Sequence, residues 1–339
     1  MSAPTLDHPD ADTDDRVALE VTGLTVDLRT PTGTVRAVDH VSFEARRGET
    51  LALLGESGCG KSMTAQSLVG LLAPIASVTD GSVTLDGVDL VSATDSTRRS
   101  MAGTELSIVF QDALTALNPV YTVGTQLAEP FRIHHGMSRK KARHEAIELM
   151  RHVGIPEPES RADSYPHQFS GGMRQRLLIA MAVALSPTVL LADEPTTALD
   201  VTVQAQIMAL LQRLREEHDM AVVLITHDLA LVSEQADRVV IMYAGSVVES
   251  GPVVDVFGAP THPYTKGLLD SVPVGAERGA DLRSIGGTPP DLHSIPSGCV
   301  YQARCPLARE RCVTERPSPR RTGVGQASAC HFWEETRNA

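Results

Sequence analysis

A glycine-rich segment in the first third of the chain has the residue types needed to bind phosphate. Residues 55–62 read Gly-Glu-Ser-Gly-Cys-Gly-Lys-Ser, which matches the P-loop pattern. Glycines let backbone N–H groups turn toward phosphate oxygens, the Lys61 ammonium adds positive charge, and the Ser62 hydroxyl can coordinate Mg²⁺. The apolar run 51–54 precedes the segment and helix-forming residues follow it, a context that disfavours an ordinary glycine-rich turn. The predicted phosphate-contacting residues are Gly55, Glu56, Ser57, Gly58, Cys59, Gly60, Lys61, Ser62 and Met63.

Two adjacent carboxylates follow a second apolar run, 189–192. Ligands of open α/β sheets collect at the carboxyl ends of the strands, so Asp193 is placed to hold Mg²⁺ directly or through water. Glu194 is placed to orient or deprotonate an attacking water. A helix-capping or solvated acidic pair is the alternative explanation. Together with the P-loop, the pair favours hydrolysis over simple nucleotide storage.

Gln111 and His227 also follow apolar runs, 108–110 and 221–226. A histidine at such a strand end could contact a terminal phosphate. Taken alone, each residue has an ordinary explanation: a structural histidine and a solvated glutamine.

Short apolar runs that alternate with helical stretches predict a parallel sheet wrapped by helices. Strand-like segments at 17–21, 24–28 and 35–43 predict an antiparallel β sheet ahead of it, with a turn at 30–33. Between Gln111 and Ser186 no strand is expected. Helices near 123–135, 138–153 and 171–185 instead predict an all-helical insertion at about 112–187.

Composition excludes several classes of protein. The 339 residues are 42% hydrophobic and 21% charged, and the formal net charge is −12, which disfavours a protein that coats a nucleic-acid backbone. No apolar run approaches the roughly 18 residues of a membrane span. Residues 1–15 carry five aspartates and no Lys or Arg, which predicts a disordered acidic tail, not a signal peptide. We therefore expect a cytoplasmic location and reduced cysteines.

Four of the five cysteines lie close together near the C-terminus, at Cys299, Cys305, Cys312 and Cys330. Four thiolates within 32 residues could hold an iron–sulfur cluster or zinc, although the spacing is not that of common zinc sites. Free thiols are the third possibility from the residues alone. Cys59 is explained as a small residue within the P-loop.

Residues 169–176 read Phe-Ser-Gly-Gly-Met-Arg-Gln-Arg and precede the Asp193-Glu194 pair. With the P-loop, Gln111, 197–200 and His227 in this order, they resemble the nucleotide-binding domain of ABC transporters over residues 16–258. The resemblance implies an α/β P-loop NTPase of ABC type, with a RecA-like core, an antiparallel β sheet and a helical subdomain.

The same resemblance assigns roles to residues. It makes Gln111 the Q-loop residue, Ala198–Asp200 the D-loop and His227 the switch histidine. It implies that Glu194, His227 and Gln111 are catalytic, that Asp193, Gln111 and His227 also contact the nucleotide, and that Ser62, Gln111 and Asp193 hold Mg²⁺. It also implies that residues of one subunit contact ATP bound to another, in trans; these are Ser170, Gly171, Gly172, Met173 and Asp200.

The signature segment also has a physical interpretation. Small residues at a helix N-terminus let a phosphate approach closely, although a helix cap without a ligand would use the same residues. Met173 stands where the family usually has Gln, so one side-chain amide contact is absent.

Residues 261–269 and 286–292, ahead of Cys299, resemble the C-terminal extension of D-type ATP-binding subunits from dipeptide and oligopeptide importers. The resemblance implies an ATPase that energises peptide uptake, bound peripherally to the cytoplasmic face of the inner membrane. Implied partners are two integral membrane permeases, a second ABC ATPase subunit and an extracytoplasmic peptide-binding protein, with no nucleic acid.

The resemblance also implies a [4Fe–4S] cluster on the four cysteines, with zinc as the alternative, within a C-terminal unit at 259–339. Alternatives for the cargo are nickel complexes, glutathione or another small solute. A soluble ABC ATPase that acts on nucleic acid is disfavoured by the charge. A non-hydrolysing regulatory subunit is disfavoured by the presence of both Glu194 and His227.

Overall fold

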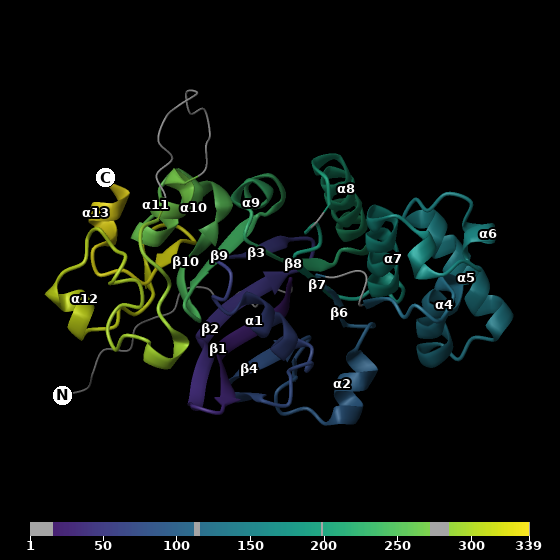
Figure 1. The fold of residues 1–339 in the computed structure, drawn as a ribbon, viewed down its shortest axis with the longest axis horizontal. Coiled ribbons are helices and arrows are strands. Elements are labelled where there is room, and N and C mark those ends of the chain that lie inside the picture. The colour runs from purple at the N-terminus through teal and green to yellow at the C-terminus, as the bar shows by residue number, and fades with distance from the viewer. Residues whose placement is uncertain (1–15, 112–115, 198, 272–284, 339) are drawn as a thin grey trace.

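A computed structural model of the protein describes residues 16–111, 116–197, 199–271 and 285–338. The predicted acidic tail, 1–15, lies outside the described residues. Five parallel strands make up most of the larger sheet, in the spatial order β9-β3-β8-β7-β6, with β6 at one edge (Figure 1). They are β3 (Thr50–Leu54), β6 (Leu106–Val109), β7 (Val189–Asp193), β8 (Ala221–Thr226) and β9 (Arg238–Tyr243).

Every residue of β3, β7 and β8 is buried. Parallel strands that are covered on both faces have continuous apolar sequences, which is why these strands could be predicted from the sequence. The helices that follow these strands are α1 (Lys61–Leu68), α8 (Val201–His218) and α9 (Leu229–Gln235). Their N-termini and the strand ends lie at one edge of the sheet, where the predicted site residues are found.

A smaller antiparallel sheet has the order β2-β1-β4-β5. Its strands are β1 (Val17–Thr30), β2 (Gly33–Arg46), β4 (Ala76–Leu85) and β5 (Val88–Asp89), and α2 (Asp95–Met101) follows them. The prediction of two separate strands at 17–21 and 24–28 is wrong. The chain passes Gly23 at a φ of 61° with a shift of register between Val21 and Leu24, so that β1 continues as a bulged strand.

The predicted helical insertion is confirmed: between Gln111 and Ser186 the described residues contain helices and no strand. Ser138 accepts a hydrogen bond from the Lys141 N–H and so caps its helix. Gly154 follows the same helix at a φ of 77°. The helices are α4 (Val123–His134), α5 (Arg139–His152), α6 (Pro158–Arg161) and α7 (Gly171–Val183).

The residues after 258 continue the core that precedes them. Strand β12 (Ala327–Ser328) pairs with β10 (Ser246–Pro252), so the C-terminal unit extends the larger sheet. Leu54 of β3 and Tyr264 belong to one hydrophobic cluster. The remaining elements of this region are α10 (Val253–Gly258), α11 (Pro263–Asp270), α12 (Glu310–Thr314), β11 (Arg320–Arg321) and α13 (Trp333–Arg337).

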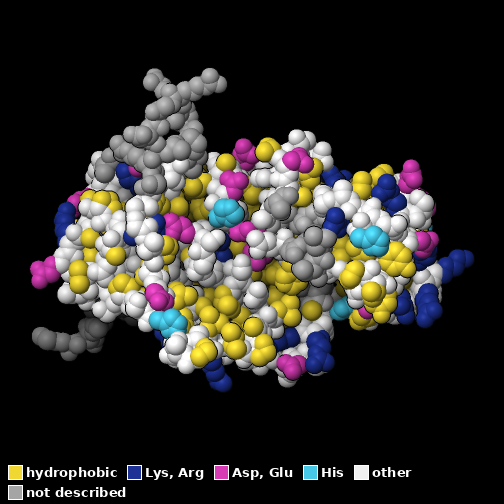
Figure 2. Space-filling view, in the orientation of Figure 1, with side chains coloured by type: hydrophobic (Ala, Val, Ile, Leu, Met, Phe, Trp, Pro, Cys, Tyr) yellow, Lys and Arg dark blue, Asp and Glu magenta, His cyan; other side chains and the backbone are white. Residues whose placement is uncertain are grey.

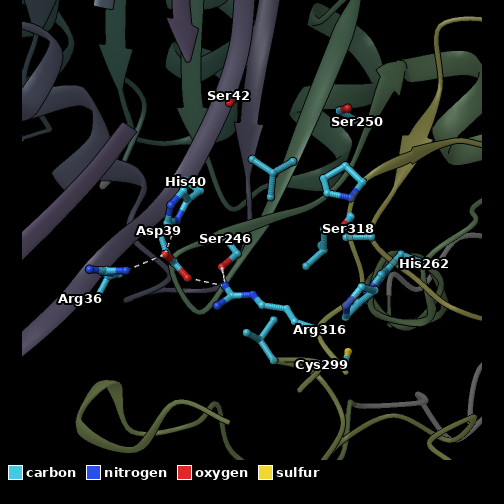
Figure 3. A pocket seen from close by; sticks show the side chains of 16 residues that line it. Arg36, Asp39, His40, Ser42, Ser246, Ser250, His262, Cys299, Arg316 and Ser318 are labelled. Atoms are coloured by element: carbon cyan, nitrogen blue, oxygen red, sulfur yellow. Dashed lines mark hydrogen bonds and ion pairs between the residues drawn. The ribbon is translucent and has the colours of Figure 1, made fainter. Parts of the chain in front are cut away.

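Polar contacts join the C-terminal unit to strand β2 of the smaller sheet (Figure 3). Arg316 reaches Asp39 of β2 and donates to the Ser246 hydroxyl at 2.8 Å. A cavity of about 490 Å³ lies beside these contacts.

A buried network on β10 also holds the C-terminal unit. Glu249 is 1% exposed and accepts hydrogen bonds from Thr261 and Gln326, and burial raises the pKa of this carboxyl. The buried network fixes the unit against β10.

Among the described residues, none of the helices has the length and apolar character required to cross a membrane. On the face drawn in Figure 2, Lys and Arg side chains are scattered among acidic ones and gather mainly at the end that carries α5 and α6.

Candidate functional site

The phosphate loop, residues 55–62, connects the end of β3 to the start of α1. Its path requires glycine at two positions. A Cβ on Gly55 would lie 2.3 Å from the Met242 carbonyl oxygen. Gly60 has a φ of 105°, and a Cβ there would lie 2.7 Å from the Ala37 carbonyl oxygen. The loop is therefore packed tightly against β2 and β9 and cannot accept side chains at these residues.

Lys61 starts helix α1 and is 5% exposed. Its Nζ donates to the carbonyl oxygens of Gly55 at 2.6 Å and of Glu56 at 3.0 Å, which holds the ammonium inside the loop. By helical geometry the N–H groups of Lys61, Ser62 and Met63 have no partner within α1. A buried cation and a helix N-terminus thus point at the same place, which suits a polyanion.

The other predicted loop residues differ in accessibility. Ser57 and Gly58 are exposed, and Cys59 is 4% exposed. Burial raises the pKa of the Cys59 thiol. Glu56 does not face the loop interior: its carboxylate pairs with Arg304, and its N–H donates to the Tyr264 hydroxyl at 3.0 Å. Of its polar groups, the carbonyl oxygen faces Lys61.

Ser62 and Asp193 are brought together as predicted. The Ser62 hydroxyl donates to Asp193 Oδ1 at 3.1 Å. Burial raises the pKa of Asp193, the hydrogen bond from Ser62 opposes this, and the neighbouring Glu194 charge adds to it. A hydroxyl and a carboxylate are oxygen ligands that Mg²⁺ prefers, and a divalent cation would offset the cost of burying the carboxylate. The residues therefore fit the ion.

Glu194 is held by side chains from the two neighbouring strand ends. Gln111 Nε2 donates to Glu194 Oε2 at 2.8 Å, and His227 Nδ1 lies 2.9 Å from Oε1. The structure thus brings Gln111 to Glu194, and no hydrogen bond joins it to Asp193 among the described residues. With 14% of its side chain exposed, Glu194 is not a solvated carboxylate, and His227, at 57%, is not a buried structural histidine.

A third partner of Glu194 was not singled out from the sequence. Thr197 Oγ1 donates to Glu194 Oε2 at 2.8 Å. Burial alone would raise the pKa of Glu194, but the hydrogen bonds from His227 and Thr197 hold this pKa below its usual range. The carboxylate is therefore ionised at neutral pH and able to accept a proton. For Thr197, the only local signal in the sequence is its position three residues after Glu194, in a turn.

Comparison with known proteins identifies the family to which this chain belongs. A dipeptide transport ATP-binding protein of Bacillus subtilis (strain 168) is 50% identical over 322 residues, covering 95% of this chain and 96% of the relative. The dipeptide transport ATP-binding protein of Escherichia coli (strain K12) is 45% identical over 314 residues, covering 93% and 96%. The chain belongs to the ABC transporter family.

The family described as "ABC transporter" matches residues 38–197, and "Oligopeptide/dipeptide transporter, C-terminal region" matches 248–312. Among solved structures, a dimeric ATP-binding cassette in a post-hydrolysis state with ADP and Pi has a TM-score of 0.62 and 28% identity. The match covers 69% of this chain and 98% of that one. The ABC fold and an ATP-binding cassette are thereby confirmed.

The ABC signature lies at the start of α7. Ser170 accepts a hydrogen bond from the Met173 N–H at 3.3 Å. A Cβ on Gly172 would lie 2.6 Å from Val203 Cγ1, so this glycine allows α7 to pack against α8. Asp200 caps α8 by accepting from the Val203 N–H. A helix cap forms with or without a ligand, so these hydrogen bonds do not test a role in trans. That role stays a prediction for Ser170, Gly171, Gly172, Met173 and Asp200. Ala198 lies outside the described residues.

Three of the four C-terminal thiols lie together: Cys299 and Cys312 belong to one hydrophobic cluster, Cys305 packs against it, and the Cys299 N–H donates to the Cys312 carbonyl oxygen at 2.7 Å. Burial raises the pKa of Cys305 to about 12 and of Cys330 to about 11, and the thiols of Cys299 and Cys312 add to both shifts. Among the described residues, one group of three potential metal-ligand atoms lies within 4.8 Å of one another, and it comes from His152, Glu217 and His218. No three of the four thiol sulfurs therefore lie within 4.8 Å of one another in this part of the structure, whereas tetrahedral zinc with bonds of about 2.3 Å requires sulfurs roughly 3.8 Å apart.

Thr197→Val removes the hydroxyl that stabilises the Glu194 carboxylate and keeps the shape of the side chain. Losing this donor raises the pKa of Glu194, so the acid limb of the ATPase pH profile moves to higher pH. We expect kcat to fall about tenfold, since a hydrogen bond to a charged group is worth about 1.5 kcal/mol or more and about 1.4 kcal/mol is a factor of ten in rate. Steady-state ATP hydrolysis measured across pH tests this.

Thr202→Val, at an exposed position on α8, is the matched control and leaves the profile unchanged. An unshifted acid limb in Thr197→Val would show that Thr197 does not tune the carboxylate.

Proposed function

We propose that this chain is the ATP-hydrolysing subunit of an ABC importer that moves dipeptides or oligopeptides into the cell. The observation that carries the proposal is the placement of Glu194, an ionised carboxylate held by Gln111, His227 and Thr197 next to the Ser62–Asp193 pair. The cargo class rests on the C-terminal region and on the names of relatives that match nearly the whole chain.

In the proposed reaction, the N–H groups at the start of α1 and the Lys61 ammonium hold the phosphates of ATP. Glu194 takes a proton from water while the water oxygen forms a bond to the γ-phosphorus. The bond from that phosphorus to the β–γ bridging oxygen breaks, and ADP leaves with the electron pair. Mg²⁺ bound at Ser62 and Asp193 would neutralise phosphate charge. Gln111 and His227 keep the base in position.

A second ABC ATPase subunit is part of the proposal. The helix that begins at Gly171 would present its N-terminus to the γ-phosphate held on the partner's phosphate loop, and Asp200 would lie at the same interface. ATP would then close two subunits head to tail, and hydrolysis would reopen them. The two movements would drive two integral membrane permeases fed by an extracytoplasmic peptide-binding protein, from the cytoplasmic face of the membrane.

We further propose a [4Fe–4S] cluster on Cys299, Cys305, Cys312 and Cys330. The Phe332 N–H donates to Cys330 Sγ at 3.4 Å. Such bonds stabilise thiolates. Because no three thiol sulfurs of the described residues lie within 4.8 Å of one another, the set favours a multi-iron cluster over one tetrahedral zinc ion.

Glu194→Gln keeps the size of the side chain but removes the base. We expect kcat for ATP to fall at least about 100-fold, because general-base catalysis contributes about 10²–10⁴-fold. ATP binding persists, so ATP-bound dimers accumulate. Phosphate release by the reconstituted transporter measures turnover. Gel filtration of the purified chain with ATP detects the dimers.

Glu216→Gln, an exposed carboxylate on α8, is the control and retains activity. Turnover by Glu194→Gln at the wild-type rate would contradict the assignment of the base.

The metal content is tested on the transporter purified anaerobically. We expect about four iron and four sulfide per chain and a loss of both in Cys305→Ser. A fully folded preparation without iron and sulfide would overturn the cluster, and zinc in their place would support the alternative.

The cargo class is tested by the ATPase activity of the assembled transporter. We expect the binding protein loaded with peptides, and not with other solutes, to stimulate that activity.

A further inference from the structure

One residue of the phosphate loop is held almost entirely by the C-terminal unit. The guanidinium of Arg304 forms a two-pronged ion pair with the Glu56 carboxylate, at 2.8 Å to Oε2 and 3.0 Å to Oε1. The two residues are 248 positions apart in sequence. The Tyr264 hydroxyl accepts the Glu56 N–H at 3.0 Å. The side chain and the N–H of Glu56 are thus both bound to residues after 258.

Arg304 is itself rigidly placed. Its side chain is 5% exposed. Its other donors reach the Gly286 carbonyl oxygen at 2.9 Å, the Ile285 carbonyl oxygen at 3.4 Å and the Tyr243 hydroxyl at 3.4 Å. A guanidinium has five N–H donors in a fixed plane, and this set uses the whole plane. The carboxylate of Glu56 can therefore occupy only one position relative to it.

The aromatic residues around this pair form a solid support. Tyr243, Tyr264 and Tyr301 are at most 2% exposed. Their ring centroids lie 4.7 Å apart for Tyr243–Tyr264, 5.1 Å for Tyr243–Tyr301 and 5.4 Å for Tyr264–Tyr301. The Arg304 N–H donates to the Tyr301 carbonyl oxygen at 3.0 Å. The turn that carries Arg304 is therefore packed against the same strand, β9, that packs against Gly55.

Movement of Glu56 would be felt in the phosphate site. Its carbonyl oxygen accepts from Lys61 Nζ at 3.0 Å and from the Cys59 N–H at 3.3 Å. Glu56 is thus the residue through which the C-terminal unit touches the lysine and the turn of the loop. Phosphate binding depends on a preformed arrangement of N–H groups, because ordering a loose loop on binding reduces affinity.

We propose that Arg304 and Tyr264 are positioning residues for nucleotide binding: by holding Glu56 they keep the phosphate loop in the shape that receives ATP. This inference rests on the proposed function, since it requires ATP at that loop. It adds a role for the C-terminal unit in the ATPase site itself, apart from transporter assembly and from the thiols.

A double-mutant cycle on the full-length chain tests the proposal. We expect Arg304→Gln and Glu56→Gln each to weaken ATP binding about tenfold, and the double variant to be no weaker than the weaker single variant, because all three lack the same contact. Calorimetric ATP titrations supply the affinities. Tyr264→Phe, which deletes only the acceptor of the Glu56 N–H, also weakens binding. Thermal midpoints and metal content, measured for each variant, show that the fold is retained.

Two control variants match these changes. Arg309→Gln breaks an exposed ion pair with Glu335 in the same unit, and Tyr301→Phe removes a hydroxyl of the same aromatic group that is not bonded to the phosphate loop in the described part of the chain. Both retain wild-type ATP affinity. In the assembled transporter, Arg304→Gln raises the KM for ATP while kcat at saturating ATP stays within about twofold; general destabilisation would instead lower kcat.

Two results would overturn the proposal. One is wild-type ATP affinity in either Glu56→Gln or Arg304→Gln, and the other is losses that multiply to about 100-fold in the double variant. Glu56→Gln leaves the C-terminal unit's own residues unchanged, so it remains informative if Arg304→Gln does not fold. Failure of wild-type protein to bind ATP would reject the proposed function, whereas equal binding by wild type and variants rejects only this inference.

Discussion

The turn from β3 into α1 is so close to its neighbours that it admits no side chain at Gly55 or Gly60. This steric constraint keeps the backbone of the phosphate loop against β2 and β9 and aims the start of α1 at one point. Lys61 is buried at that point because the carbonyl oxygens of Gly55 and Glu56 accept its ammonium hydrogens. A buried ammonium is stable only with such partners, so the loop and the lysine depend on each other.

The predicted catalytic groups lie close to this loop because parallel strands end at one edge of a sheet. β7 ends in Asp193, and β6 and β8 are followed by Gln111 and His227. The sheet therefore brings Gln111, 83 positions from Glu194, and His227, 33 positions from it, into one hydrogen-bonded set. The two adjacent carboxylates differ: burial raises the pKa of Asp193, while at Glu194 burial is outweighed by the hydrogen bonds from His227 and Thr197 together with nearby positive charge, so its pKa is lowered.

The sequence was most informative where chemistry depends on local spacing. The phosphate loop, its flanking strand and helix, and the helical insertion were predicted because a few neighbouring residues determine each of them. The bulge that keeps β1 continuous at Gly23 was missed, since a glycine there indicates a turn as readily as a bulge. The ion pair between Glu56 and Arg304 has no local pattern, because the two residues meet only when the C-terminal unit packs on β9 and β10. Thr197 was missed because one hydroxyl in a turn has many common explanations.

The C-terminal residues consequently have two physical relations to the ATPase core. They share its hydrophobic cluster and extend its sheet, and they reach the phosphate loop directly through Arg304 and Tyr264. A region that matches the C-terminal region of oligopeptide/dipeptide transporters thus lies in contact with the predicted phosphate loop.

The most direct test of the central claim is the affinity of the Lys61→Ala variant for ATP with Mg²⁺, measured by calorimetry beside wild type and Lys140→Ala. Lys140 is an exposed lysine on α5. The account predicts at least about a tenfold loss of affinity, or about 1.4 kcal/mol, in Lys61→Ala and none in Lys140→Ala. Equal affinity in all three proteins would contradict the assignment of residues 55–62 as the site that holds the triphosphate.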